Sequence, residues 1–378
     1  MRVLFSARDP AAAQVAGNLY AAAQRDQRFE PYLVAASPAF GILKSQGFQI
    51  LELQVSSTDS HDLIEQRVTS LIDGVAPLAI VAGSSGPDAG VDEYLVKYGS
   101  KCRTYVVQDF WGDVNLAAGE QADCYLVCDQ FAADLTNKRV DAETLVVGSV
   151  KHAHFAALNV DALRSKSRAL LSVHGDDFVI GYFGAPLADC PGYWRSVEAL
   201  AHALSAVDAK IVYRPHPKES TEARERTADI LGLAQSSVDN ASEPVETLLA
   251  GCDLVVSCYS SCGIDAELMN SQESNPSRVS MFLLFDQEIL EHYQAITRLP
   301  DVPISMQNRS VSVHSEKSLG NFIREFADRP TRVKFLENAK SNQSVGVLPT
   351  AAESPKRVLD KVWSDINSAR QKSLAQSK

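Results

Sequence analysis

The sequence has no long apolar run. Of its 378 residues 45% are hydrophobic, yet no stretch approaches the ~20 apolar residues that a membrane-spanning helix needs. The opening residues, Met1–Ser6, meet Arg8 and Asp9 too soon to be the apolar part of a signal peptide. We therefore expect a globular cytoplasmic protein, and the length allows two or three compact domains.

Positive charge and paired cysteines are also scarce. The net charge of -11 argues against an extended nucleic-acid surface, which needs clustered Lys and Arg. The seven cysteines are odd in number and lie mostly within strand or helix patterns, which fits buried thiols in a reducing compartment. Two C-x3-C pairs, Cys124/Cys128 and Cys258/Cys262, lack further His or Cys partners at finger-like spacing. We expect neither a metal site nor a cofactor.

What the sequence does have is a regular alternation of short apolar runs and longer helical patterns. This alternation is typical of βαβ units and a parallel sheet, so we predict an α/β fold. The first half predicts strands at Val3–Ser6, Tyr32–Ala36, Gln49–Leu53, Leu78–Ala82, Thr104–Gln108, Tyr125–Cys128 and Thr144–Val147. The second half predicts strands at Phe178–Phe183, Lys210–Arg214, Leu254–Ser257 and Met281–Phe285.

Two Rossmann-like domains explain this order of elements. We predict an N-terminal domain at 1–155, a C-terminal domain at 156–349, a C-terminal helix at 350–366 and a disordered tail at 367–378. The helix carries an apolar stripe that is typical of a packing face, whereas the tail is polar. If two such sheets face each other, the loops at their carboxyl ends line one cleft, where open α/β sheets bind ligands.

A histidine between two prolines ends one predicted strand, in the segment Tyr213-Arg-Pro-His-Pro-Lys-Glu-Ser220. The prolines restrict the backbone, and Pro217 is well placed to open a helix toward Leu231. His216 would then lie near a helix N-terminus, which favours an anion. An imidazole there can donate to a phosphate oxygen, although a lone histidine can also serve only to satisfy a carbonyl.

A second polar turn lies in Asp253-Leu-Val-Val-Ser-Cys-Tyr-Ser-Ser-Cys-Gly-Ile-Asp-Ala-Glu267. Hydroxyls and free N–H groups at a helix start form a small anion nest, and Gly263 permits close backbone approach. Ser260 taken alone also fits a plain N-cap. Gly184, directly after a strand, could let backbone approach a ligand or be an ordinary turn glycine.

These two turns together resemble the C-terminal domain of GT-B-fold glycosyltransferases, especially bacterial capsule, lipopolysaccharide and teichoic-acid enzymes. Sialyltransferases and Kdo transferases that use CMP-sugars carry an HP motif and a Ser-Ser/Thr motif, and CDP-glycerol glycerophosphotransferases are similar. The resemblance in layout covers most of the chain, whereas the motifs cover a small part. It implies two Rossmann-like domains facing across a cleft, with the C-terminal helix packing back.

In those families both motifs hold the phosphate of the donor. The HP pair corresponds to His216 and Pro217, and the hydroxyl pair to Ser260 and Ser261. With these, the predicted donor site comprises Arg214, Lys218, Tyr259, Gly263 and Gly184. Preorganised donors stabilise the charge that grows as the sugar–phosphate bond breaks, and this scheme requires no metal. The sequence has no D-x-D metal motif, and Asp176-Asp177 is interpreted as a turn.

An inverting transfer also needs a base, which in GT-B enzymes usually comes from an N-terminal-domain loop. Asp109 and Asp113 flank Phe110 and Trp111, which could raise a carboxylate's pKa and stack on a sugar. Asp9 is the third candidate, and its position fits the start of a turn and helix equally well. We prefer Asp109. The acidic Asp/Glu-Asp/Glu-Gly motif of the sialyltransferases is absent, which argues against sialic acid as the donor sugar.

The predicted function is transfer of a sugar from a CMP-, CDP- or UDP-linked donor to a glycan or lipid-linked glycan acceptor. The nucleotide-sugar is then a substrate, and peripheral association with the inner face of the membrane is compatible with such an acceptor. The sequence has no strongly basic amphipathic helix that would indicate docking to a membrane. The loop Gly83–Pro87 could face the acceptor or simply turn the chain.

Two alternatives stay open. The first is an isomerase related to the non-hydrolysing UDP-N-acetylglucosamine 2-epimerases, which share the two-domain fold and a histidine-proline turn. Their Ser-Gly-Gly-x-Gln-Glu segment is replaced here by Tyr259-Ser-Ser-Cys-Gly-Ile-Asp265, and this difference argues against an isomerase. The second is a protein that keeps the fold for binding without catalysis.

Overall fold

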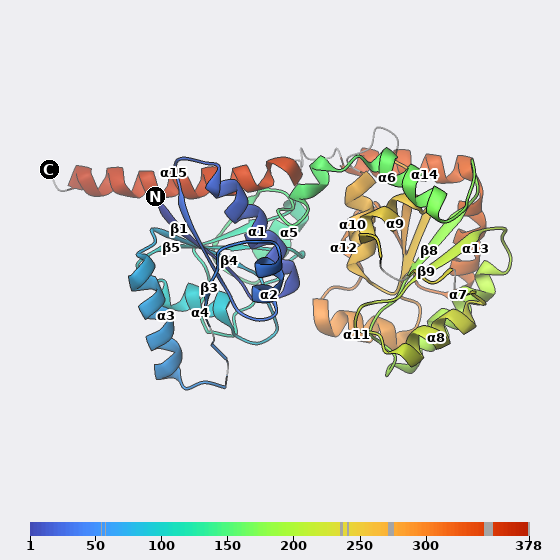
Figure 1. The fold of residues 1–378 in the computed structure, drawn as a ribbon, viewed down its shortest axis with the longest axis horizontal. Coiled ribbons are helices and arrows are strands. Elements are labelled where there is room, and N and C mark those ends of the chain that lie inside the picture. Colours follow the sequence, from blue (N-terminus) through green and yellow to red (C-terminus); the bar gives the residue numbers. More distant parts are fainter. Residues whose placement is uncertain are drawn as a thin grey trace. The chain divides into compact units, whose positions relative to one another are not determined.

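The chain divides into two compact units. The computed structural model describes residues 1–53, 55–56, 58–234, 237–239, 242–270, 276–343 and 351–376. The N-terminal unit is Met1–Ala156 with Val347–Lys378, and the C-terminal unit is Ala157–Gly346 (Figure 1). Each unit is built around one parallel sheet.

The sheet of the N-terminal unit has seven described strands, all parallel, in the order β3-β2-β1-β4-β5-β6-β7. The strands are β1 Arg2–Ala7, β2 Glu30–Ala35, β3 Leu51–Glu52, β4 Ala79–Gly83, β5 Arg103–Val107, β6 Cys124–Val127 and β7 Glu143–Val146. The helices are α1 Pro10–Gln24, α2 Ala39–Ser45, α3 His61–Val75, α4 Val91–Tyr98, α5 Gln130–Thr136 and α15 Ser354–Gln376. Every strand predicted for this half is confirmed.

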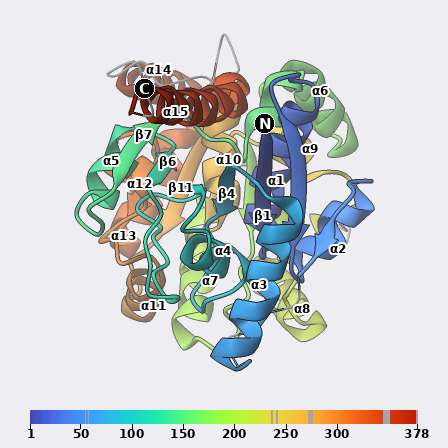
Figure 2. The same cartoon turned by 90° about the vertical axis from the view of Figure 1, so that its left-hand side faces the viewer.

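Helices cover both faces of this sheet, because successive apolar residues of β1 point to opposite faces. Val3 and Phe5 belong to a core that includes residues of α1, α2 and α15. Leu4 points to the other core, which includes residues of α3 and α4. Figure 2 shows α3 and α4 together beside β1 and β4. Two-sided cover explains why the strands are apolar runs rather than half-polar ones.

Helix α15 belongs to the N-terminal unit although it ends the chain. Its stripe of Val358, Leu359, Val362 and Ile366 is buried in the core with α1. The helix continues to Gln376, through residues for which the sequence predicts disorder. That prediction is wrong for 367–376, because adding a residue to an existing helix gains a hydrogen bond without new nucleation.

The C-terminal unit has a second parallel sheet, whose described strands run in the order β12-β11-β10-β8-β9. They are β8 Val179–Phe183, β9 Lys210–Arg214, β10 Leu254–Ser257, β11 Val279–Leu283 and β12 Val311–Val313. The first four confirm the prediction. Strand β12 was not predicted, because its three residues are too few for an alternation pattern to be recognised.

The helices of this unit connect the parallel strands. They are α6 Val160–Leu170, α7 Pro191–Leu204, α8 Thr221–Ile230, α9 Val245–Gly251, α10 Ser261–Asn270, α11 Gln287–Thr297, α12 Pro303–Met306, α13 Glu316–Ala327 and α14 Arg329–Gln343. Within the described ranges, no helix in either unit combines the length and apolar character needed to cross a membrane.

The strand orders locate where each sheet can bind a ligand. In the N-terminal unit the order reverses between β1 and β4, and in the C-terminal unit between β8 and β10. Open α/β sheets bind ligands outside the carboxyl ends of their strands at such switch points. The polar turns predicted from the sequence follow these strands or their neighbours.

Candidate functional site

The histidine-proline turn lies at the carboxyl end of β9, beside β8. Glu219 N donates to His216 O at 2.9 Å and closes the turn. Helix α8 begins only at Thr221, with Ser220 as its N-cap, accepting from Ala223 N at 3.1 Å. The prediction that Pro217 opens the helix is therefore wrong, because the Ser220 hydroxyl provides a better cap. Pro217 is exposed in the turn.

The hydrogen bonds of the turn select one form of His216. Lys218 N donates to His216 Nδ1 at 3.1 Å, so Nδ1 acts as an acceptor. Partial burial lowers the pKa of His216, and the charge of Lys218 lowers it further. A neutral imidazole whose Nδ1 accepts must carry its proton on Nε2. His216 is thus prepared to donate one hydrogen bond through Nε2.

A buried carboxylate that the sequence analysis missed anchors this turn. Glu219 is 5% exposed and accepts from His216 N, from Tyr213 Oη at 2.9 Å and from Tyr193 Oη at 3.2 Å. These bonds join the turn to β9 and α7. Burial raises the pKa of Glu219, and the three donors act in the opposite direction.

Gly184 lies directly after β8 and faces the same carboxylate. A Cβ built on Gly184 would meet Glu219 Oε2 at 2.3 Å. The absence of a side chain at Gly184 therefore leaves space for Glu219. This packing requirement accounts for the glycine, in addition to the predicted close approach of a ligand.

The Ser-Ser turn follows β10, on the other side of β8. Ser260 N donates to Ser257 Oγ at 3.1 Å, and Ser260 Oγ accepts from Cys262 N at 3.3 Å. Ser260 is thus the cap of α10, and Ser261 is exposed as its first residue. A Cβ on Gly263 would meet the ring of Phe282 at 2.6 Å, so this glycine also has a packing reason.

The two turns are separated by one strand. Because neighbouring strands lie about 4.8 Å apart, the ends of β9 and β10 are separated by about 10 Å. The end of β8 and Gly184 lie between them. The structure therefore brings His216, Gly184 and Ser260 to one edge of one sheet.

Arg214 and Tyr259 have other partners in the predicted donor site. Arg214 forms an ion pair with Asp239 and donates to Glu243 O at 3.1 Å. Tyr259 Oη lies 2.6 Å from His292 Nδ1, and the two rings stack. Lys218 is exposed beside the histidine.

Carboxylates gather at the carboxyl edge of the N-terminal sheet. Burial raises the pKa of Asp109 to about 7, Lys151 opposes this, and Asp113 and Asp9 raise it further. The three predicted base candidates are therefore close enough to interact. Asp9 Oδ1 caps α1 by accepting from Ala12 N at 2.8 Å, and Asp113 Oδ2 accepts from Ser84 Oγ at 2.6 Å.

The aromatic neighbours of Asp109 have different positions. Trp111 is 5% exposed, and its Nε1 donates to Asp129 Oδ2 at 2.8 Å. A buried indole cannot stack on a sugar, so that expectation is wrong for Trp111. Phe110 is half-buried and packs edge-on against Trp111 at 5.7 Å between ring centroids.

A pair of buried carboxylates on α4 was also missed. Asp92 accepts from Ser6 Oγ at 2.6 Å and from Ser85 Oγ at 2.7 Å, and Glu93 accepts from Gly90 N at 2.8 Å. Burial raises the pKa of both carboxyl groups. The only signal in the sequence is two acids in the first turn of a helix, which is ordinary for surface helices.

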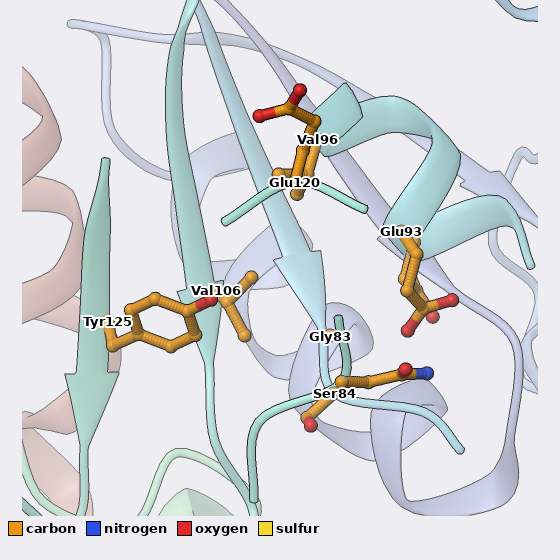
Figure 3. Close-up of a pocket in the computed structure, with 9 residues that line it drawn as sticks. Gly83, Ser84, Glu93, Val96, Val106, Glu120 and Tyr125 are labelled. Atoms are coloured by element: carbon orange, nitrogen blue, oxygen red, sulfur yellow. The ribbon is translucent and has the colours of Figure 1, made fainter. Parts of the chain in front are cut away.

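A cavity of about 10 Å³ adjoins this pair, which is room for about one water. Figure 3 shows Glu93 reaching from α4 toward the loop that carries Ser84, with Val106 and Tyr125 on other strands. Ser84 and Ser85 tie the loop after β4 to the half-buried Asp113 and the buried Asp92, respectively. Across the part of the chain that the structure describes, no group of three or more His, Cys, Asp or Glu side chains is placed to hold a metal ion.

Comparisons with known proteins give the fold. No family model matches the chain, and no curated protein matches it. The structure of Staphylococcus aureus MnaA with UDP matches with a TM-score of 0.68 at 13% identity, covering 97% of each chain. UDP-GlcNAc 2-epimerase from Neisseria meningitidis bound to UDP-GlcNAc matches with a TM-score of 0.64 at 10% identity, covering 96% of this chain and 100% of that one.

A third solved structure matches as well. MurG from Acinetobacter baumannii has a TM-score of 0.60 at 11% identity, covering 96% of this chain and 99% of that one. At such identities the likeness concerns the fold alone. The chain has the two-domain α/β fold of the GT-B type, and these three neighbours are not the CMP-sugar transferases that its motifs resemble.

Proposed function

We propose that this protein is a glycosyltransferase that moves a sugar from a nucleotide-linked donor to a glycan acceptor. The observation that carries the proposal is the state of His216. Its Nδ1 accepts from Lys218 N, which leaves an Nε2–H donor at the carboxyl edge of the C-terminal sheet. A neutral, oriented donor suits a phosphate oxygen that gains negative charge as the sugar leaves.

The surrounding residues support this role through preorganisation. Glu219 fixes the backbone of His216, so the imidazole needs no rearrangement when charge develops. The exposed Ser261 and the start of α10 lie one strand beyond β8, and we assign them to the same phosphate group. Lys218 adds a positive charge beside it. No metal has a role in this proposal.

Transfer also requires removal of a proton from the acceptor hydroxyl. We assign this step to Asp109, whose pKa of about 7 is matched to a base working near neutral pH. The proton moves from the acceptor oxygen to the carboxylate, the acceptor oxygen bonds to the sugar, and the nucleotide leaves with the bonding electrons.

An epimerase acting on a UDP-sugar is the second candidate. One observation favours it: an epimerase bound to UDP-GlcNAc has the same fold over 96% of this chain. A phosphate held by His216 would serve either reaction. The segment Tyr259–Asp265 lacks the Ser-Gly-Gly-x-Gln-Glu pattern of the epimerases, and this favours the transferase.

Nucleotide binding to wild type and His216→Ala tests the proposal. Thermal unfolding is followed with CMP, CDP, UDP and GDP, because ligand at ~100 times its dissociation constant adds about 2.7 kcal/mol. The matched control is His202→Ala, since His202 is exposed in the last turn of α7. We expect one nucleotide to stabilise wild type and the control but not His216→Ala.

The identity of that nucleotide separates the candidates. A cytidine nucleotide supports transfer from a CMP- or CDP-linked donor. A uridine nucleotide calls for incubation with UDP-GlcNAc, where NMR detection of inversion at C2 would establish the epimerase. Stabilisation by none of them contradicts the donor-site assignment and favours a non-catalytic protein.

A further inference from the structure

An arginine-lined pocket lies at the amino edge of the C-terminal sheet, opposite the edge that carries the histidine-proline turn. Its volume is about 220 Å³. Arg164 and Arg168 reach it from α6, Arg329 and Arg332 from α14, and Asp253 from the residue before β10. We call it the arginine pocket. Its four arginines outnumber its three aspartates.

The one buried aspartate of the pocket is fully engaged. Asp253 accepts from Arg164 Nη2 at 2.6 Å, from Arg168 Nη1 at 3.3 Å and from Val179 N at 2.9 Å. A single carboxylate thus serves two guanidinium groups. These contacts explain why both arginines of α6 are present, and among the described residues Asp253 makes no hydrogen bond to α14.

Arg332 is a nearly buried cation that forms no ion pair among the described residues. It is 6% exposed, its Nη1 donates to Phe326 O and to Ala327 O at 3.1 Å, and its guanidinium lies 4.6 Å from the ring centroid of Phe178. Among the described residues, its Nε and Nη2 have no hydrogen-bond partner. Neither atom is among those sealed from solvent, and Arg332 lines the pocket.

The remaining charged groups do not offset Arg332. Arg329 forms an ion pair with Asp176, and both side chains are largely exposed. Asp177 is bound to His174 N at 2.8 Å. Burial lowers the pKa of Arg332, and repulsion from Arg164 and Arg329 lowers it further against the attraction of Asp253 and Asp328. A buried guanidinium held among others of the same charge is stabilised by a bound anion.

We propose that the arginine pocket binds a phosphate-type dianion, held by Arg332 and Arg329, at a site separate from the nucleotide-donor site. A guanidinium group presents two parallel N–H donors that match phosphate oxygens. The volume is smaller than the about 300–1,000 Å³ of pockets that take drug-sized ligands, so the ligand is small. Inorganic phosphate and a small phosphate monoester share this chemistry.

Calorimetric titration of the full chain with inorganic phosphate tests the site, at pH 7 and constant ionic strength with sodium chloride as the reference salt. We expect saturable binding to wild type. Arg332→Met should weaken it about tenfold or more, because a hydrogen bond to a charged group contributes about 1.5–3 kcal/mol. Arg329→Met should weaken it less, and it is the deciding variant if Arg332→Met fails to fold.

Two controls locate the site. Arg324→Met removes an exposed arginine that donates to Asn321, and His216→Ala removes the donor-site histidine. Both should bind phosphate as wild type does. Absence of saturable binding, equal binding by the arginine-pocket variants, or loss of binding in His216→Ala would overturn the proposal. Parallel titration with glycerol 3-phosphate then identifies the source: tighter binding indicates a monoester, and equal binding indicates free phosphate.

Discussion

The carboxyl edges of the two sheets both lie at a switch point of parallel strands, but they carry opposite chemistry. At the N-terminal edge, Asp109, Asp92 and Glu93 are carboxyl groups whose pKa is raised, first of all by burial. At the C-terminal edge the proposed donor is His216, whose pKa is lowered, and the carboxylate of Glu219 accepts a hydrogen bond from its backbone N–H.

In the proposed reaction, this difference assigns a separate task to each edge. A carboxyl group with a pKa near neutrality can accept a proton, whereas a preorganised neutral donor can stabilise an anion. The carboxylate at the C-terminal edge positions a backbone turn instead of facing solvent, because three donors bind it. We therefore expect variants at the two edges to fail in different ways.

Asp109→Asn should cause the largest change in activity. Loss of a general base typically lowers the rate by about 100- to 10,000-fold, and an amide cannot accept the acceptor's proton. Initial rates with the donor identified by the nucleotide screen measure this effect. Nucleotide affinity should stay within about twofold of wild type, and the exposed Asp73→Asn on α3 is the matched control. A variant with wild-type turnover would remove Asp109 from the mechanism.

His216→Ala should lower turnover by about 100- to 1000-fold, as expected for loss of one preorganised donor to a developing charge. In contrast to Asp109→Asn, it should also weaken nucleotide binding. The pH dependence of its residual rate should still follow the ionisation of Asp109. Equal nucleotide affinity in His216→Ala and wild type would show that the phosphate binds elsewhere.

Glu219→Gln should weaken nucleotide binding about tenfold and lower stability by about 1–3 kcal/mol. The amide keeps the shape of the side chain, but it cannot accept all three hydrogen bonds that the carboxylate accepts. Chemical denaturation and the nucleotide titration measure the two effects. Glu225→Gln, at an exposed position of α8, should change neither. If Glu219→Gln lost stability but bound nucleotide normally, the carboxylate would support the fold and not the turn.

The last prediction concerns the pH dependence of stability and not activity. Because the pKa of Asp109 is about 7 against an ordinary 3.8, the folded state holds a proton that the unfolded state has lost. Stability should therefore fall as pH rises from about 4 through 7 and level off above. In Asp109→Asn the melting temperature should fall less over this range, because the amide does not titrate. Parallel melting curves for the two proteins would contradict the raised pKa.

The sequence predicted most of the architecture because buried parallel strands are short apolar runs between turns. It missed β12, which is short, and it ended the last helix too early because polar composition resembles disorder. It located His216 and the Ser-Ser turn because unusual local residues mark strand ends. All of these predictions rest on patterns among residues that are neighbours in the sequence.

The sequence analysis missed the groups whose role depends on packing between elements. Glu219 follows His216 by three residues, yet its importance comes from the space at Gly184 and from hydroxyls on β9 and α7. Trp111 was expected to meet a sugar, but Asp129 binds it in the interior. Neither relation leaves a pattern in a single sequence.

The most direct test of the central claim is the protonation state of His216. Long-range ¹H–¹⁵N correlation NMR on histidine-labelled protein, with His216→Gln to assign the signal, distinguishes the two neutral forms of the ring. The account predicts a neutral imidazole with its proton on Nε2 at pH 7, and a shift of that nitrogen when the nucleotide from the screen is added. A ring protonated on Nδ1, or an Nε2 signal that the nucleotide leaves unchanged, would contradict it.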